Sequence, residues 1–172
     1  MNIGGNNTPP AFINTLGKIV LKLDKYDDVK DFSCGLAAAS FKDDDNAGYI
    51  DHQGKMVIGP IESAEPESFD KGLAIVSQFK NGKSLFGVVS LTGTFVIPVQ
   101  YDHVRLNTDG NFLVEKKAQQ LVLDRDGKLV IKFPANCTWV DLPDKISKET
   151  WIPCGFGGKG YREKYRGLLG SK

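Results

Sequence analysis

The residue types best suited to chemistry are few and widely spaced in this chain. There are two histidines, His52 and His103, and neither has a cysteine, a serine or a second histidine at a motif spacing. The three cysteines, Cys34, Cys137 and Cys154, are odd in number and form no C-x-x-C pair. We therefore expect reduced thiols, with no structural disulfide and no zinc site. The sequence predicts no catalytic residue, no cofactor and no metal ligand.

Two other stretches match ligand-binding loops only in part. The run Asp43–Asn46 could offer oxygen ligands to calcium, but the mid-loop glycine and closing glutamate of a calcium loop are absent. The run Gly155–Gly160 contains Lys159, but a P-loop needs serine or threonine after its lysine, and here a glycine follows. We interpret the first run as an exposed acidic loop tip and the second as a flexible segment.

The net charge of +1 conceals two halves of opposite sign. Residues 1–70 contain six lysines and arginines against twelve aspartates and glutamates, whereas residues 71–172 contain sixteen against nine. An acidic surface of this kind either serves only solubility or attracts a basic partner and speeds its association. For the second case we expect contact through acidic loop residues of the first half: Asp27, Asp28, Asp31, Asp43, Asp44, Asp45, Glu62, Glu65 and Glu67.

The C-terminal end is basic and contains aromatic residues. From Gly155 onward there is one glutamate, and Phe156, Tyr161 and Tyr165 lie among the basic residues. Such a tail could follow a nucleic-acid backbone and stack on bases, but a solvated tail or one that docks on the acidic half fits equally well. Its basic residues are Lys159, Arg162, Lys164, Arg166 and Lys172.

A repeated unit must position these residues. Gly48–Ile58 consists of a short apolar run, a four-residue turn ending in glycine and a second apolar run, and it recurs in altered form at 11–21, 87–97 and 120–131. Each turn begins with Asn, Asp or Ser, whose side chain can accept a hydrogen bond from the backbone two residues on. The final glycine permits the positive φ with which the chain rejoins a strand. The turns are Asn14–Gly17, Asp51–Gly54, Ser90–Gly93 and Asp124–Gly127.

The segments beside the turns are rich in β-branched residues and therefore predict strands. The turn glycines are 37, 39 and 34 residues apart, a spacing typical of repeats that share a core with their neighbours. The chain has 172 residues, of which 41% are hydrophobic and 25% charged, as expected of a soluble domain. We predict an all-β domain over residues 11–134, made of tandem antiparallel β-hairpins in an arc or a propeller-like array.

The two ends do not follow the repeat. Met1–Pro10 is polar and predicts a flexible arm without a secretory signal, while residues 135–172 predict a small irregular or helical cap. Short helical turns are expected at Ser147–Thr150 and Arg162–Leu169. No run has membrane-spanning length, so we expect a cytoplasmic protein that does not contact membranes. Two large apolar residues are expected to cover the open end of the array: Trp139 and Trp151.

Four segments resemble the repeats of the bacterial WG-repeat family, and the resemblance extends over roughly residues 11 to 134. They are Phe32–Ala37, Gly48–Ile58, Phe69–Ala74 and Phe95–Asp102. The sequence departs from the family at the Trp-Gly pair, where it has Ala47-Gly48, Phe86-Gly87 and Gln119-Gln120.

The resemblance implies an array of antiparallel hairpins and no catalytic constellation, hence a non-enzymatic bacterial protein-binding module. By analogy its most concrete role is that of an immunity protein that binds and occludes a cognate toxin, and a basic toxin domain would suit the acidic loops. Two alternatives stay open: a nucleic-acid-binding protein that uses the basic tail, and an enzyme whose site is assembled across repeats.

Overall fold

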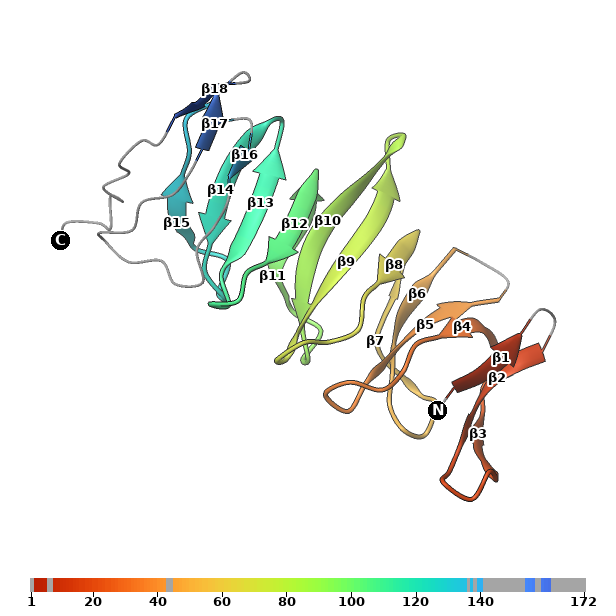
Figure 1. The fold of residues 1–172 in the computed structure, drawn as a ribbon. Helices are drawn as coiled ribbons and strands as arrows, with labels where there is room; N and C mark the ends of the chain where they lie inside the picture. The colour runs from red at the N-terminus through yellow and green to blue at the C-terminus, as the bar shows by residue number, and fades with distance from the viewer. Residues whose placement is uncertain are drawn as a thin grey trace. The chain divides into compact units, whose positions relative to one another are not determined.

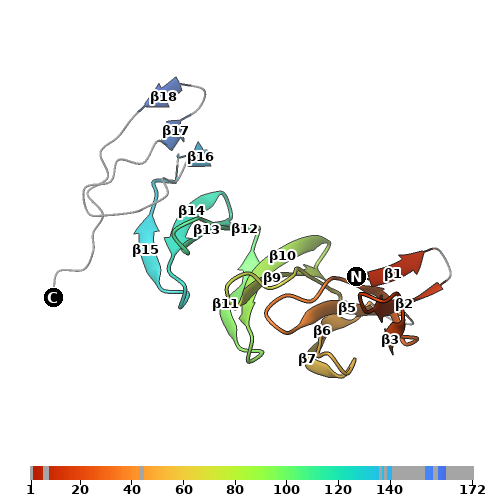
Figure 2. The same ribbon diagram turned by 60° about the horizontal axis from the view of Figure 1, so that its bottom comes forward.

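The computed structural model describes residues 2–5, 8–42, 45–135, 137, 139–140, 154–156 and 159–161. Within these residues every regular element is a β-strand, so the predicted all-β fold of tandem antiparallel hairpins is confirmed. In each of five sheets the strands lie side by side in their order along the chain (Figures 1 and 2).

The first three sheets are formed by β1 to β11. The first sheet contains β1 (Asn2–Gly5), β2 (Thr8–Ile13) and β3 (Ile19–Lys22). The second contains β4 (Tyr26–Val29), β5 (Ala37–Phe41), β6 (Ala47–Ile50) and β7 (Met56–Ile61). The third contains β8 (Ala64–Pro66), β9 (Leu73–Lys80), β10 (Lys83–Ser90) and β11 (Phe95–Tyr101).

The last two sheets are formed by β12 to β18. The fourth sheet contains β12 (His103–Leu106), β13 (Phe112–Lys116), β14 (Gln119–Leu123) and β15 (Leu129–Lys132). The fifth contains β16 (Trp139–Val140), β17 (Cys154–Phe156) and β18 (Lys159–Tyr161).

The four predicted turns join the last two strands of the first four sheets. In three of them a side-chain oxygen at the first position accepts hydrogen bonds from the backbone N–H groups two and four residues on. These acceptors are Asn14, Asp51 and Asp124, with N···O distances of 2.8–3.0 Å. The turn glycines Gly17, Gly54, Gly93 and Gly127 have φ values of 74°, 74°, 81° and 79°. The glycine predicted from the sequence therefore serves all four chain reversals, and the predicted side-chain acceptor serves three of them.

The chain divides into two compact units, 1–99 and 100–172. Among the described residues, two clusters of buried side chains lie in the first unit and one in the second. A repeat array gives this result because each repeat packs mainly on its neighbours and no single core spans all of them.

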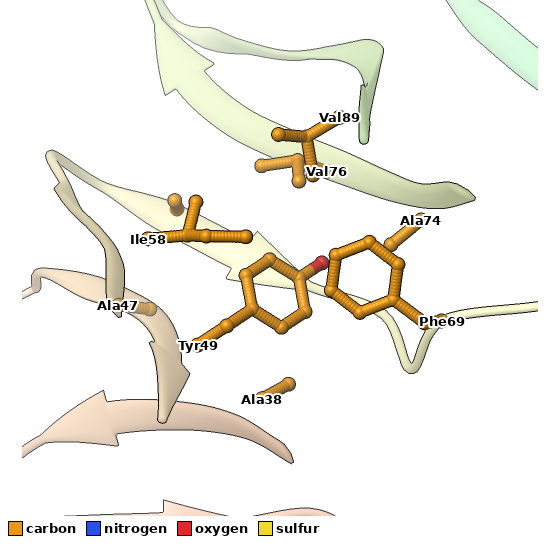
Figure 3. Packing of buried hydrophobic residues seen from close by; sticks show 9 residues of the cluster. Ala38, Ala47, Tyr49, Ile58, Phe69, Ala74, Val76 and Val89 are labelled. Carbon is orange, nitrogen blue, oxygen red and sulfur yellow. The ribbon is translucent and has the colours of Figure 1, made fainter. Parts of the chain in front are cut away.

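The central cluster of the first unit packs the second sheet against the third. Tyr49 is fully buried, and its ring centroid lies 4.6 Å from that of Phe69, beside Ile58, Val76 and Val89 (Figure 3). Burial of one such aromatic or aliphatic side chain contributes about 1.5–3 kcal/mol. This shared cluster fixes how the two sheets face each other.

Gly48, in β6, leaves no room for a side chain. A Cβ atom there would lie 2.2 Å from the carbonyl oxygen of Ile58 in β7. The neighbouring backbone comes this close because β7 bulges: Tyr49 pairs with Ile58, whereas Ala47 pairs with Ile61. The glycine is therefore required by a close backbone approach.

The position that Gly48 occupies in the second sheet is occupied by different residues in the other sheets. At Gly87, in β10, a Cβ atom would lie 2.7 Å from the carbonyl oxygen of Ile97. In the first and fourth sheets the position belongs to Ala11 and Leu121, which pair regularly with Lys22 and Lys132, and the register shift comes only after the next pair. At Gly48 the glycine therefore occurs opposite a bulge of the next strand, whereas Ala11 and Leu121 occur where the pairing is regular.

The N-terminal arm differs from the prediction of a flexible segment. Asn2–Gly5 forms β1 and pairs with β2, with Ile3 opposite Ala11. The open edge of β2 can accept another strand, and this pairing outweighs the weak strand preference of a glycine-rich segment.

The C-terminal cap also differs from the predicted irregular or helical form in the part that is described. Its three short strands form an antiparallel sheet, with Trp139 opposite Gly155. The expected helical turns at 147–150 and 162–169 lie outside the described residues, as does Trp151.

Candidate functional site

A groove of about 860 Å³ lies in the first unit, lined by residues of β4, β5, β8 and β9 and of the turns beside them. Its charged lining residues are Asp27, Asp28, Lys30, Lys42, Asp45 and Glu65. The lining also includes three small buried residues and one exposed aromatic residue: Ala38, Ala39, Ala64 and Phe79. Four carboxylates against two ammonium groups make the groove acidic.

A bulge in β4 presents two aspartates together. Tyr26 pairs with Phe41, but the next pair is Asp28 with Ser40, so Asp27 is the extra residue on its strand. Tyr26 and Val29 are buried while both aspartates are exposed. A regular strand would send neighbouring side chains to opposite faces, so the bulge is what leaves Asp27 and Asp28 both on the groove side.

The opposite wall follows ordinary strand alternation. In β8, Ala64 and Pro66 are buried and Glu65, between them, is exposed. Glu65 pairs with Ser77 of β9. Because successive side chains of a strand point to opposite faces, burial of the two flanking residues exposes the Glu65 carboxylate.

Hydrogen bonds between side chains and backbone carbonyls join the two walls. The Lys30 ammonium donates to the carbonyl oxygen of Pro66 over 3.0 Å, and the Tyr49 hydroxyl donates to that of Glu67 over 2.8 Å. The Ser33 hydroxyl donates to the carbonyl oxygen of Phe69 over 2.6 Å. These bonds connect the second sheet to the segment that contains β8, so the groove is preformed.

The buried tyrosine also reports on the local electrostatics. Burial raises the pKa of Tyr49 well above its ordinary value, and the negative charge of Glu67 raises it further. The hydroxyl therefore stays protonated and continues to donate its hydrogen bond.

The structure brings together four of the acidic residues predicted for partner binding: Asp27, Asp28, Asp45 and Glu65 all line the groove. Three others are exposed but do not line it: Asp31, Glu62 and Glu67. The last two, Asp43 and Asp44, lie outside the described residues.

Sequence reasoning missed the apolar part of the groove. Ala38 of β5, which lines the groove, corresponds to Ile75 of β9 when the two Gly-Leu-Ala segments are aligned. This loss of volume in one repeat was a readable signal. Phe79, which is 61% exposed, gave no signal of its own, because a lone aromatic at a strand end is common.

Neither histidine lines the groove, and the two lie in different units. The His52 ring stacks on Phe32, with centroids 4.1 Å apart and planes 9° apart. His103 begins β12 and pairs with Glu115. His52 thus covers the aromatic ring of Phe32, which is a packing role.

The prediction of reduced thiols without a disulfide is wrong for one cysteine. Cys137 is disulfide-bonded and is buried in the cluster with Val122, Ile131 and Phe133. Cys34 is free and exposed. An odd number of cysteines without a spacing motif cannot reveal a pair that only folding brings together.

Three further expectations from the sequence concern metal binding, membrane-spanning helices and the basic tail. Among the residues that the structure describes, no three His, Cys, Asp or Glu side chains could together hold a metal ion. Nor does the described part of the chain contain a helix long and apolar enough to cross a membrane. The basic tail lies outside the described residues except for the backbone of β17 and β18.

Comparison with known proteins identifies the repeats. The WG containing repeat model matches residues 11–44, 48–83 and 86–118, more than half of the chain. The chain belongs to the WG containing repeat family. Each matched segment of this WG-repeat protein starts at or near the penultimate strand of one sheet and extends into the next sheet. Each family repeat thus links two consecutive sheets.

The structure also corrects one position of the Trp-Gly pair in this WG-repeat protein. In the fourth sheet Leu123 pairs with Leu129, as Ile50 pairs with Met56 in the second. Counting back along the strand from these pairs places Gln120-Leu121, and not Gln119-Gln120, at the positions of the Trp-Gly pair. Counting back three residues from Asp51 and from Asp124 gives the same register in the sequence.

A solved structure shows limited similarity to the WG-repeat protein. The crystal structure of a protein of unknown function from Bacteroides caccae matches with 18% identity and a TM-score of 0.41. The match covers 77% of this chain and 56% of that one, so this chain spans little more than half the length of that protein. No curated protein sequence matches this chain significantly.

Proposed function

We propose that this WG-repeat protein is a non-enzymatic protein-binding module whose acidic groove receives a basic segment of a protein partner. The observation that carries the proposal is that Asp27, Asp28, Asp45 and Glu65 line one preformed groove. A cleft lined by charges of one sign concentrates the potential and attracts an oppositely charged partner. Such complementarity raises the association rate and excludes partners of the wrong charge.

The most concrete form of this role is that of an immunity protein that occludes a cognate toxin. Toxin domains that act on nucleic acids are often basic, because they must approach phosphates. A basic loop seated in the groove would place the surrounding sheets against the toxin surface and block its active site. The repeat scaffold suits this because the hydrogen-bonded walls need little reordering on binding.

We infer a compartment from the cysteines. A cytoplasmic location was expected because no run has membrane-spanning length, but a disulfide at Cys137 fits an oxidising compartment better. We propose that the protein works where this disulfide can form. Cell fractionation followed by immunoblotting tests this, and a purely cytoplasmic signal would contradict it.

The binding role is tested with a protein partner captured from a lysate of the source organism. The groove variant combines Asp27→Asn, Asp28→Asn, Asp45→Asn and Glu65→Gln, and the control combines Asp31→Asn, Glu62→Gln and Glu67→Gln. Affinity is measured by surface plasmon resonance at several salt concentrations. The groove variant should bind more weakly and with a flatter salt dependence, because screening acts on the charges that were removed.

Equal behaviour of the groove variant and the control would reject the groove as the binding site. The immunity role has its own test, in which the captured partner is expressed alone and together with this protein. If the partner arrests growth, co-expression of the wild-type protein should restore it and the groove variant should not. A partner without effect on growth would rule out the toxin version while leaving the binding role in place.

A further inference from the structure

The exposed apolar residues of the first unit gather along one edge of its sheets. Among the described residues, seven of the eight large hydrophobic side chains that are exposed lie in the predicted turns or in the strand that follows each turn. Single apolar residues on a surface need no explanation, whereas a group of them marks an interaction site. Six of the seven belong to the first unit, and we call them the apolar edge: Leu16, Ile19, Val20, Val57, Leu91 and Phe95.

Consecutive turns follow one another along this edge. A Cβ atom at Gly54 would lie 3.4 Å from Cδ1 of Leu21 in β3, and one at Gly93 would lie 3.5 Å from Cγ2 of Ile58 in β7. Each of these turns therefore packs on the last strand of the sheet before it. The packing places the turns and last strands of the three sheets next to one another in order, so the apolar edge crosses all three.

A bulge exposes a valine in each of the first two sheets. Ile19 and Leu21 pair with neighbouring residues of β2, so Val20 between them is the extra residue of β3. Val57 is the extra residue of β7 in the same way. The two valines are 61% and 48% exposed. Because a bulge interrupts the ladder, these edges are poor templates for an added strand, and a partner must contact the side chains instead.

The fourth sheet shows that this strand position accepts an apolar cover. Val130 is the extra residue of β15, as Val20 is of β3. Val130 packs against the buried cluster that contains Ile131 and Cys137. Apolar side chains of the same chain thus cover this position in the second unit, whereas the described residues of the first unit leave Val20 and Val57 exposed.

The apolar edge is basic, although it lies in the acidic half of the chain. Residues 14–22, 52–61 and 91–101 contain three lysines and no aspartate or glutamate, whereas residues 1–70 as a whole contain twelve acidic residues against six basic ones. All three lysines are exposed, and none forms an ion pair with another described residue: Lys18, Lys22 and Lys55. Charge complementarity therefore favours an acidic partner with apolar side chains.

The spacing of the sheets favours a helix as the binding segment. Stacked sheets lie about 10 Å apart, and seven residues of an α-helix rise about 10.5 Å. Every seventh residue of a helix lies on the same face to within about 20°, so one apolar face can contact Val20 and then Val57. An extended strand covers the same distance in about three residues, an odd number that would turn every second contact away from the surface.

We propose that the apolar edge is a second docking surface, for an acidic amphipathic helix of a protein partner. Apolar side chains of the helix pack on Val20 and Val57, and the carboxylates beside them face the three lysines. This inference goes beyond the groove and does not depend on it. No residue of the apolar edge lines the groove, and the two surfaces attract segments of opposite charge.

The test mixes the whole chain with three blocked peptides, each three heptads long. The first has leucine at every seventh residue and glutamates beside it, the second has lysine in place of glutamate, and the third has the composition of the first with its leucines off that spacing. Fluorescence anisotropy of labelled peptide measures affinity, and circular dichroism measures helix formed on mixing. We expect the first peptide to bind about ten times more tightly than the others, less so at high salt, and to become helical. Equal binding of the first two peptides, or binding without a gain of helix, would overturn the proposal.

Variants locate the binding on the apolar edge. Val20→Ser combined with Val57→Ser removes two apolar contacts and should weaken binding of the acidic peptide about tenfold. The control Phe79→Ser changes an exposed apolar side chain of the same unit outside the edge and should have no effect. Equal affinities of these two variants would contradict the proposal. Circular dichroism of each variant alone confirms folding, and Leu16→Ser, at a side chain that is 79% exposed, replaces the double variant should that misfold.

A second pair of variants tests the charges. Replacement of the three edge lysines by glutamine should weaken binding of the acidic peptide and flatten its salt dependence. The control removes the same amount of charge elsewhere in the first unit and should leave the salt dependence as it is; it replaces Lys25, Lys42 and Lys80 by glutamine. The same salt dependence in both variants would reject the role of the edge lysines.

Two further measurements exclude other occupants of the apolar edge. In sedimentation velocity, a dimer that the valine variant dissociates would assign the edge to a second copy of this chain. Binding of the wild type, and not of the valine variant, to vesicles of phosphatidylserine and phosphatidylcholine would assign it to a membrane surface. We expect neither result, and either one would overturn the proposal. The groove variant described above should bind the acidic peptide as the wild type does, so failure of one surface leaves the other in place.

Discussion

The ammonium group of Lys30 donates a hydrogen bond of 3.0 Å to the carbonyl oxygen of Pro66, 36 residues further along the chain. It joins the end of β4 to the end of β8, across the acidic groove. Lys30→Met keeps the aliphatic stem and removes the donor. We expect the free energy of unfolding to fall by about 0.5–1.5 kcal/mol, near the lower value because Lys30 is exposed.

Urea denaturation measures this effect. The control is Lys42→Met, which removes the same charge from the groove lining and leaves the Lys30 bond in place. An equal loss of stability in both variants would show that charge, and not the bond between the walls, matters.

Gly48 should not tolerate a methyl group. In Gly48→Ala the new Cβ would lie 2.2 Å from the backbone oxygen of Ile58, and backbone cannot swing aside as a side chain can. We expect a loss on the order of 3 kcal/mol, the upper part of the usual range for overpacking. Gly82→Ala is the comparison, since its space is open and only its positive φ is strained, for about 1–2 kcal/mol. A smaller loss at Gly48 than at Gly82 would refute the steric account.

Tyr49 should make stability depend on alkaline pH. Its pKa is raised above the ordinary value of 10.0 by burial, so the folded state holds the proton more tightly than the unfolded state. The resulting stability is complete below pH 10 and is lost as pH rises further. Tyr49→Phe removes a hydrogen bond worth about 1 kcal/mol at neutral pH, but it should lose less stability between pH 10 and 11. Parallel pH curves for both proteins would contradict this.

His52 should stabilise the fold through its stack on Phe32. The rings lie 4.1 Å apart and almost parallel, and such pairs contribute about 0.5–1.5 kcal/mol. His52→Ala should therefore lower the melting temperature, whereas Gln53→Ala in the same turn should leave it nearly unchanged. Differential scanning calorimetry compares the two, and similar melting temperatures would remove the stack from the list of stabilising contacts.

The cysteines should differ in reactivity. Cys34 is free and exposed, so iodoacetamide should alkylate it at once in the folded protein. Cys137 is disulfide-bonded and should react only after reduction and unfolding. Peptide mass mapping shows which cysteine carries the label. Alkylation of Cys137 in the denatured but unreduced protein would disprove the disulfide.

The sequence by itself determined the hairpins. A turn such as Asp51–Gly54 depends on a side-chain acceptor, a glycine with positive φ and two apolar flanks, all within a few residues. Local chemistry of this kind is readable without knowing what lies elsewhere, and its repetition predicted the all-β fold and the family. The same approach missed β1, because pairing with the edge of β2 and not the preference of its own residues orders that segment.

Only the tertiary structure decided which acidic residues share a site. The charge count selected nine candidates without distinguishing Asp28, which lines the groove, from Asp31, which does not. That distinction depends on a bulge in β4 and on the packing of β8 beside β5, and neither is encoded within a short stretch. Ala38 and Ala64, which come from different sheets, both line the groove and pack in one buried cluster. Strand reversal is a local property, whereas a groove is made by the residues that meet across it.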